Sequence, residues 1–488
     1  MLLTDDLLLH YKRCKRRAFL DIYGDLSLQD QEQDFLRKLR RDSHTHQQAV
    51  LAQEVHHSPD YPRGDWQAGA KATLELMQQG KERISQAVLL MQTQGVTLLS
   101  RPDLLVKQPG QSVFGDWIYV PTSIKLGRRP KPEYQIVAAF SAHLLAVVQG
   151  ICPSNAWLIL RRQDSYAVNL ERWLPLMQDI LSECLETLLL PQEPEVFISR
   201  QRCGLCRWYS SCYAIASANQ HLSLLPGVTP TRYRDLRTLG VTTLKSLATA
   251  SISSLETVVI SEIASSLIQQ AQSTLQNRAI LRQDFSDTNT SVFLKKTNIL
   301  STASVELYFD IEAEPELQLD YLLGVLLINR RTNTEIFYAF LAENPRDEAL
   351  IWQQFLDLVA LYPDAPIYHF SDYEVETVKR LFKLYKTSTP QQVRQLLSRF
   401  VDVHQQVMDT VTLPVESYSL KHLARWLGFE WRDAGVTGQE CVCLYDQWLE
   451  TSDRSLLSLI LRYNEDDCRA THHLKNWLVN FLQNPVQS

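Results

Sequence analysis

Hydrophobic and polar positions divide the first part of the chain into strand-like and helix-like stretches. Apolar residues at strand spacing predict β-structure over 96–106, 115–126 and 156–162. The stretch 134–150 is apolar on nearly every side, which is typical of a buried helix. Thr4 fits the N-cap of an N-terminal helix, because two aspartates follow it in what would be the first turn. An α/β domain is expected here.

The pattern changes twice further along the chain. Residues 222–250 read LSLLPGVTPTRYRDLRTLGVTTLKSLATA, which predicts short helices around glycine turns. Residues 283–304 are polar and rich in Ser, Thr and Asn, as a linker is. From 305 onward, strand-like runs are followed by helices, so a second α/β domain with a mixed sheet is expected. The predicted parts of this multidomain α/β protein are 1–218, a helical 219–280, a linker 281–304, and 305–488.

Composition places the protein among ordinary globular chains. It has 488 residues, of which 45% are hydrophobic and 21% charged. No uninterrupted apolar stretch of about 18 residues occurs, so a membrane span is not expected. The charges near the N-terminus follow a short apolar patch, the reverse of a secretory signal. We therefore expect a cytoplasmic protein whose nine cysteines are thiols or metal ligands.

Charge is distributed unevenly along the sequence. The net charge of −6 does not by itself favour nucleic acid as a partner. However, YKRCKRR at 11–17 has five basic residues in seven, and KLGRRPK at 125–131 has four in seven. Such patches can contact phosphate whatever the net charge. A solvated helix face or loop is the alternative for either patch.

Three cysteines, Cys203, Cys206 and Cys212, have the spacing C-x2-C-x5-C. Sites built from thiolates usually have four ligands, so one ligand is missing. Cys14 lies in a basic context that favours a thiolate. This arrangement resembles the iron–sulfur RecB-type nucleases of the PD-(D/E)XK superfamily. The resemblance implies a [4Fe–4S] cluster on these four cysteines; a zinc site with a histidine and unrelated thiols are the alternatives.

The same resemblance implies a nuclease core of two carboxylates and a lysine around a divalent ion, often with an upstream histidine. Asp103 in SRPDLLV matches the first carboxylate, Lys125 the lysine and His46 the histidine, with His44 as the alternative. Ser123 stands where the family has Asp or Glu. Because a hydroxyl does not hold a divalent cation as a carboxylate does, this domain is a candidate for a degenerate nuclease kept for binding.

Residues 222–250 resemble a helix–hairpin–helix module. In such modules, backbone N–H groups at a helix N-terminus hold a phosphate without contacting a base. The resemblance places Gly227 in the hairpin turn, with Arg232 and Arg234 supplying positive charge. A plain helical linker or a protein-contact module is the alternative.

The C-terminal region has a second set of carboxylates. Asp310 and Glu312 in YFDIEA alternate on a strand and therefore face the same side, which is costly without a metal. Glu374 stands where a short strand leads into a helix. Tyr463 and Asp467 form a Y-x-x-x-D pair in RYNEDDCRATHHL, which we expect to open a helix.

These motifs resemble the DEDD-type 3′–5′ exonucleases of the RNase H-like fold, in the branch with a tyrosine. The resemblance implies that Asp310, Glu312, Glu374 and Asp467 hold two Mg²⁺ or Mn²⁺ ions, and that Tyr463 orients the attacking water. Asp466 could take the place of Asp467, and Asp372 that of Glu374.

Together the motifs resemble a RecB-family nuclease fused through a helix–hairpin–helix to an RNase H-like exonuclease. We expect a metal-dependent nuclease that cuts DNA at single-stranded 3′ ends in repair or recombination, with nucleic acid and no membrane as its partner. The first alternative is a catalytically decayed nucleic-acid-binding scaffold for a helicase or repair complex. The second is an RNA exonuclease, because metal-bound carboxylates contact the phosphate and not the sugar.

Overall fold

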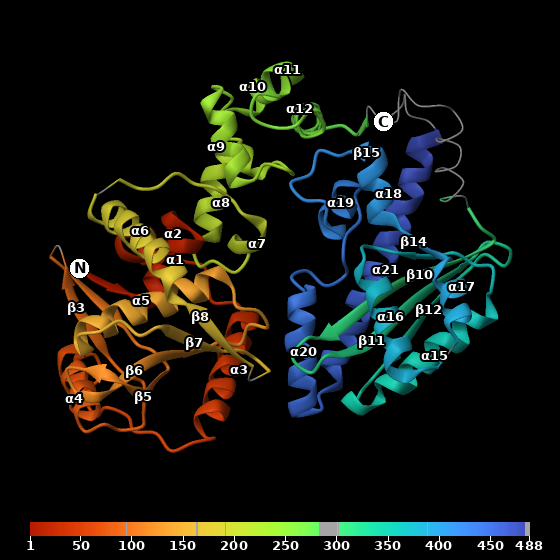
Figure 1. Cartoon of the computed structure of the whole chain (residues 1–488). Coiled ribbons are helices and arrows are strands. Elements are labelled where there is room, and N and C mark those ends of the chain that lie inside the picture. Colours follow the sequence, from red (N-terminus) through yellow and green to blue (C-terminus); the bar gives the residue numbers. More distant parts are fainter. Residues whose placement is uncertain are drawn as a thin grey trace. The chain divides into compact units, whose positions relative to one another are not determined.

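The computed structural model describes residues 1–93, 95–162, 164–190, 192–282, 300, 302–387 and 389–483. It divides into an N-terminal unit, 1–215, and a C-terminal unit, 216–488 (Figure 1). Most of the predicted linker lies outside the described residues, and the predicted domain boundaries stay a prediction. Among the described helices, none combines the length and apolar character needed to cross a membrane.

The N-terminal unit is built on a five-stranded sheet of order β2-β5-β6-β7-β8 and a three-stranded sheet of order β1-β4-β3. The predicted strand over 96–106 is two strands, because Pro102 lies between them and lacks the N–H that a continuing ladder needs. The strands are β1 Leu2–Thr4, β2 Arg83–Ser85, β3 Leu89–Thr93, β4 Val96–Ser100, β5 Leu104–Ser112, β6 Gly115–Ile124, β7 Asn155–Ile159 and β8 Ser165–Asn169.

Helices pack against these sheets. As expected, Thr4 caps the first helix, and its hydroxyl accepts a hydrogen bond from Leu7 N. The apolar stretch at 134–150 is a buried helix, α5, which connects the parallel strands β6 and β7. The helices are α1 Asp5–Arg13, α2 Lys15–Tyr23, η1 Leu26–Leu28, α3 Asp34–Leu51, α4 Trp66–Gln78, α5 Pro132–Gln149, α6 Leu170–Leu189, α7 Arg200–Cys203 and α8 Tyr209–Ala218.

The C-terminal unit begins with short helices that end in the longer α12. Buried glutamines fasten α12 to the rest of this unit: Gln270 Nε2 donates to Leu413 O at 2.7 Å, and Thr412 donates to Gln269 at 2.9 Å. The elements are η2 Leu222–Leu224, α9 Pro230–Thr238, α10 Leu244–Ala248, α11 Ile252–Leu255, α12 Ser261–Gln276 and β9 Ile280–Leu281, which pairs with β15 Val411–Thr412.

The remainder forms the predicted mixed sheet, with strand order β12-β11-β10-β13-β14. β11 is antiparallel to β10, whereas β13 and β14 continue in parallel. The strands are β10 Val305–Glu314, β11 Leu319–Asn329, β12 Thr334–Leu341, β13 Ile367–His369 and β14 Phe400–Asp402. The helices are η3 Pro345–Asp347, α15 Glu348–Leu361, α16 Tyr373–Tyr385, α17 Pro390–Leu397, α18 Val403–Thr410, α19 Leu420–Trp426, α20 Gly438–Thr451 and α21 Arg454–Gln483.

Helix α21 lies along the face of β10 that bears the acidic residues. Its Lys475 bonds Glu306 at 2.8 Å, and its Asn464 bonds Asp310 at 2.7 Å. The stretch RYNEDDCRATHHL was expected to open a helix, but it lies in the middle of α21. The helix begins earlier because Leu457 and Ile460 bury on the same face one and two turns before the motif.

Candidate active site

Three carboxylates meet on the inner face of the C-terminal sheet. Asp310 and Glu312 project from β10, and Asp467 projects from α21. One oxygen of each lies within 4.8 Å of the others, which is close enough to share an ion. The alternation along β10 predicted the first two, while the third depends on how α21 packs.

Glu374 is the fourth predicted carboxylate. It is buried in the first turn of α16, which follows β13, and its charge raises the pKa of both Asp310 and Glu312. His369 Nδ1 lies 3.6 Å from Glu374 Oε2, yet that buried oxygen has no hydrogen-bond partner among the described residues. The alternative residue, Asp372, is exposed.

The electrostatics of this cluster are unfavourable without a cation. Burial, and then the charge of Asp467, raise the pKa of Asp310 and of Glu312 well above the usual range. Burial also raises the pKa of Asp467 to about 7, against hydrogen bonds that lower it. Burial raises the pKa of Glu374 as well. Crowded, buried carboxylates of this kind are the donor set that a divalent metal ion binds.

Asn464 positions Asp310 and was missed by the sequence reasoning. Its Nδ2 donates to Asp310 Oδ2, and its own Oδ1 is buried without a hydrogen-bond partner among the described residues. Gly324 on β11 makes room for it, because a Cβ there would lie 1.7 Å from Asn464 Oδ1. The sequence held one signal: Asn464 precedes Asp467 by three positions and so shares its helix face.

Tyr463 lies beside the cluster, where burial, and then the charge of Asp467, raise the pKa of its hydroxyl. Two further residues at this point were missed. Trp431 Nε1 donates to Asp467 Oδ1 at 2.7 Å, and Lys421 Nζ lies 4.6 Å from the centre of the Tyr463 ring. Both follow α18 on a part of the chain far from the motifs, and no local spacing singles them out.

Asp466 does not share the site. It is buried, and both of its oxygens accept from Arg432, one from the backbone N and one from the guanidinium. Asp467, on the neighbouring helical position, faces the carboxylates. The structure therefore favours Asp467 over the alternative.

In the N-terminal unit, Asp103 and Lys125 come together as the resemblance implied, with 3.8 Å between Lys125 Nζ and Asp103 Oδ2. Asp103 also accepts from Ile124 N and from Gln47 Nε2, both at 2.6 Å. Ser123 lies buried on β6 beside them. Asp103 thus stands without a second carboxylate at the family position.

His46 occupies a different environment from its neighbour Gln47. Its ring is next to the backbone of Ile159 and Leu160, and burial lowers its pKa. Its Nε2 is buried with no hydrogen-bond partner among the described residues. Gln47, which sequence reasoning missed, is the α3 residue that contacts Asp103.

The four predicted cysteine ligands gather in the N-terminal unit. Burial raises the pKa of Cys203, Cys206 and Cys212, and that of Cys203 reaches about 11. The charges of the neighbouring thiolates raise these pKa values further, which shows that the four sulfur atoms lie near one another. Backbone N–H groups of Arg17 and Ser199 donate to Cys14 Sγ and Cys203 Sγ. Cys14 can face the others because it interrupts the helix between α1 and α2.

The hairpin of the helical module has the expected glycine turn. Gly227 has φ +87°, a left-handed conformation that favours glycine. Arg232 caps the turn, donating to Gly227 O at 2.7 Å, whereas the Arg234 side chain is largely exposed. The element before the turn is the three-residue η2, not a full helix.

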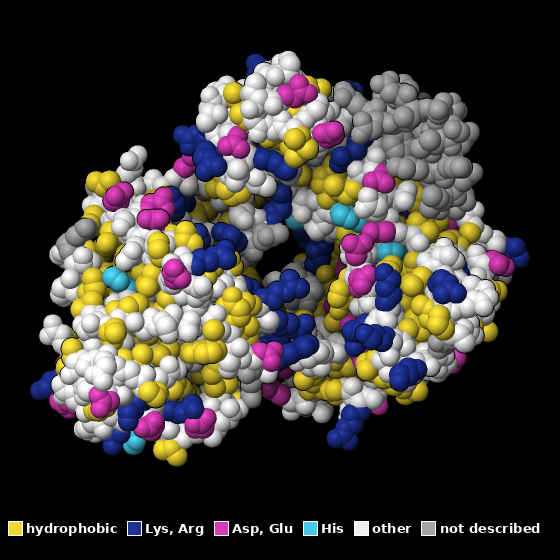
Figure 2. Space-filling view, viewed as in Figure 1, with side chains coloured by type: hydrophobic (Ala, Val, Ile, Leu, Met, Phe, Trp, Pro, Cys, Tyr) yellow, Lys and Arg dark blue, Asp and Glu magenta, His cyan; other side chains and the backbone are white. Residues whose placement is uncertain are grey.

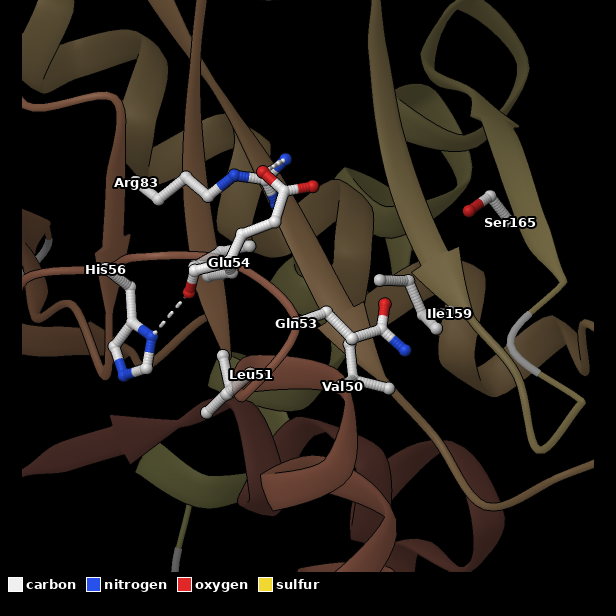
Figure 3. Close-up of a pocket in the computed structure, with 9 residues that line it drawn as sticks. Val50, Leu51, Gln53, Glu54, His56, Arg83, Ile159 and Ser165 are labelled. Carbon is white, nitrogen blue, oxygen red and sulfur yellow. Dashed lines mark hydrogen bonds and ion pairs between the residues drawn. The ribbon is translucent and has the colours of Figure 1, made fainter.

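A cavity of about 220 Å³ in the N-terminal unit lies between the end of α3 and the sheet (Figure 3). Three of its polar residues contact one another: Arg83 pairs with Glu54, and His56 bonds the Glu54 carbonyl. The cavity adds no acid–base pair to the unit among the residues described.

Comparison with known proteins identifies the C-terminal region. The family model of the RNase_H superfamily matches residues 307–479. No curated protein matches the chain. The matched residues contain nearly all of the mixed sheet and of α21, and all four carboxylates. The C-terminal region of this chain is therefore an RNase H-like domain, a fold typical of phosphodiester hydrolases that act on nucleic acid.

Proposed function

We propose that the C-terminal unit is a metal-dependent exonuclease of the DEDD type that degrades single-stranded DNA from the 3′ end. The observation that carries this proposal is the convergence of four carboxylates from β10, α16 and α21. They are Asp310, Glu312, Glu374 and Asp467. The Y-x-x-x-D pair on α21 adds the tyrosine of that exonuclease type.

The side chains of this site have different roles in the proposed reaction. When bound, Mg²⁺ or Mn²⁺ supplies Lewis acidity toward water and phosphate, and the four carboxylates would hold it. Asn464 orients Asp310 through its amide. The Tyr463 hydroxyl, which lies beside Asp467, orients the attacking water. Lys421 offers a positive charge next to the acidic cluster, toward the phosphate of the strand.

The test is digestion of 3′- and 5′-labelled single-stranded DNA and RNA with Mn²⁺, using anaerobically purified protein. We expect stepwise loss from the 3′ end of DNA. Asp310→Ala should slow it about 100-fold or more, because metal-based charge stabilisation is worth several kcal/mol. Asp103→Ala, in the other unit, is the matched carboxylate control and should digest like the wild type.

Three outcomes would contradict the proposal. Unchanged digestion by Asp310→Ala would exclude this site. Faster digestion of RNA would make the protein an RNA exonuclease. No digestion of any strand, with binding intact, would indicate a decayed scaffold. A helicase or repair partner stays a prediction from the resemblance.

For the N-terminal unit we propose a [4Fe–4S] cluster on Cys14, Cys203, Cys206 and Cys212. Four neighbouring thiols and N–H donors to two sulfur atoms support it.

We also propose that the N-terminal unit binds nucleic acid without cutting it. Ser123 supports this, because Asp103 and Lys125 lack a second carboxylate for a divalent ion. The hairpin at Gly227 is proposed as a second phosphate contact, with Arg232 and Arg234 beside it.

A further inference from the structure

The N-terminal unit contains a cavity of about 780 Å³ where its two basic sequence segments meet. Three arginines come from the segment at 11–17 and two lysines from the segment at 125–131. Figure 2 shows that Lys and Arg side chains gather in groups on the visible face of the molecule. The lining residues from the two segments are Arg13, Arg16, Arg17, Lys125 and Lys131.

Positive charge dominates the wall of this cavity. Among its described lining residues, seven arginines and two lysines stand against one acidic residue, Glu133. Arg13 pairs with Glu133 at 3.5 Å. Carboxylates outside the lining pair with five more of these cations: Glu193 with Arg16, Asp21 with Arg17, Glu32 with Arg40 and Arg207, and Asp103 with Lys125. A concave, basic surface concentrates positive potential, so the ligand that it fits is polyanionic.

Two arginines on the wall have unmet donors. Arg16 is 8% exposed; its terminal nitrogens pair with Glu193 and donate to Pro194 O, while its Nε has no hydrogen-bond partner among the described residues. The Nε of Arg17 is buried and has no hydrogen bond either, but it forms an ion pair with Asp21 Oδ2 at 3.8 Å. Buried donors without acceptors are costly, and phosphate oxygens are acceptors that match a guanidinium.

Aromatic side chains accompany the charges. Tyr134 and Tyr209, both half-buried, line the cavity, and Lys131 Nζ lies 5.7 Å from the centre of the Tyr134 ring. Basic grooves with aromatic side chains are typical of single-strand binding, because unpaired bases can stack. All four cysteines line the same cavity, so the proposed cluster would occupy part of its volume and the strand would bind in the remainder.

The cysteine segments build part of this wall. Cys14 stands between Arg13 and Arg16 in the sequence, while Arg202 and Arg207 flank Cys203 and Cys206, and these residues line the cavity. Bringing the thiols together therefore also brings together arginines that are far apart in the sequence.

We propose that this cavity binds the phosphate backbone of single-stranded nucleic acid. The proposal rests on the proposed nuclease function for the identity of the ligand. It names a strand-holding site in the N-terminal unit that is separate from the carboxylates of the C-terminal unit.

The test is fluorescence anisotropy of labelled dT20 with full-length Asp310→Ala protein, between 50 and 200 mM salt. Lys131→Gln/Arg207→Gln neutralises two lining charges whose side chains reach solvent. Dissociation constants should rise about tenfold at low salt. The slope of the logarithm of the binding constant against the logarithm of the salt concentration should become shallower by about 1.4, at about 0.7 for each lost phosphate contact. The matched control is Lys71→Gln/Arg172→Gln, two exposed charges of the same unit outside the cavity, which should change neither.

Equal affinity and slope in the cavity and control variants would overturn the proposal. So would equal binding of a duplex of the same length, or equal thermal stabilisation by inorganic phosphate alone, which would indicate a small-anion site. Hydrolysis of the p-nitrophenyl ester of thymidine 5′-phosphate by the wild-type chain tests the nuclease separately. Cavity-dependent dT20 binding without ester hydrolysis would refute the proposed function and leave this site standing.

Discussion

The absence of a side chain at Gly324 leaves space for Asn464, the residue that orients Asp310. We expect Gly324→Ala to displace Asn464 and to lower both activity and stability, the latter by about 1–3 kcal/mol, as overpacking of a filled core does. Thermal unfolding and the digestion rate measure the two effects.

Gly438→Ala is the control for this substitution. The nearest atom to a Cβ there is the Tyr463 hydroxyl, at 4.0 Å. Equal losses in both variants would show that Gly324 has no special role in holding Asn464.

His472 introduces a pH dependence of stability. Burial lowers its pKa to about 4, and the ring packs on Tyr308 with Nε2 placed to accept from Asn476. An unfolded histidine has a pKa of about 6.5, so between about 4 and 6.5 the unfolded chain binds more protons. The contribution of His472 to the free energy of unfolding is therefore complete above about pH 6.5. It decreases as the pH falls, by at most about 1.4 kcal/mol per pH unit.

Urea unfolding at several pH values measures this slope. We expect His472→Gln to flatten it between pH 4 and 6.5, and His473→Gln, on the exposed neighbouring position, to leave it unchanged. An equally steep slope in His472→Gln would assign the pH dependence to other groups.

The contact between α21 and β10 contains a fully buried ion pair, Lys475 with Glu306. Arg330 and Tyr308 also bond Glu306. Lys475→Met should destabilise the C-terminal unit by about 3–5 kcal/mol, because it leaves a buried carboxylate short of its closest cation. Urea unfolding provides the measurement.

An exposed pair serves as the comparison. Lys379→Met removes the partner of Glu376 at the surface and should cost about 1 kcal/mol or less. Similar costs for the two variants would mean that the buried pair is not what holds α21 on the sheet.

For the whole molecule, the two units have separate hydrophobic cores, so each is expected to unfold in its own transition. Cys14→Ser should abolish the visible absorption of the proposed cluster and lower the unfolding temperature of the N-terminal unit only. Cys152→Ser, which changes an exposed cysteine, should leave both the visible absorption and the unfolding temperature of the N-terminal unit unchanged. Retained absorption in Cys14→Ser would refute this ligand assignment.

Local patterns sufficed for much of the protein. The alternation over 305–314 placed Asp310 and Glu312 on one face, because successive strand residues point to opposite sides. The mixed α/β fold of the C-terminal region followed from apolar runs separated by helical stretches. Helix boundaries were less certain, since the motif at 463–467 continues a helix that starts earlier.

Contacts between distant segments were decided only by the tertiary structure. Trp431 reaches Asp467, and Lys421 reaches the Tyr463 ring, because α19 and the loop after it pack on α21, and no spacing in the sequence assigns either contact. Gln47 rather than His46 contacts Asp103 because helix rotation, set by packing, selects which neighbour faces the sheet. The sequence determined which chemical groups are present and their local periodicity, whereas burial, pKa and partnership arise from packing in three dimensions.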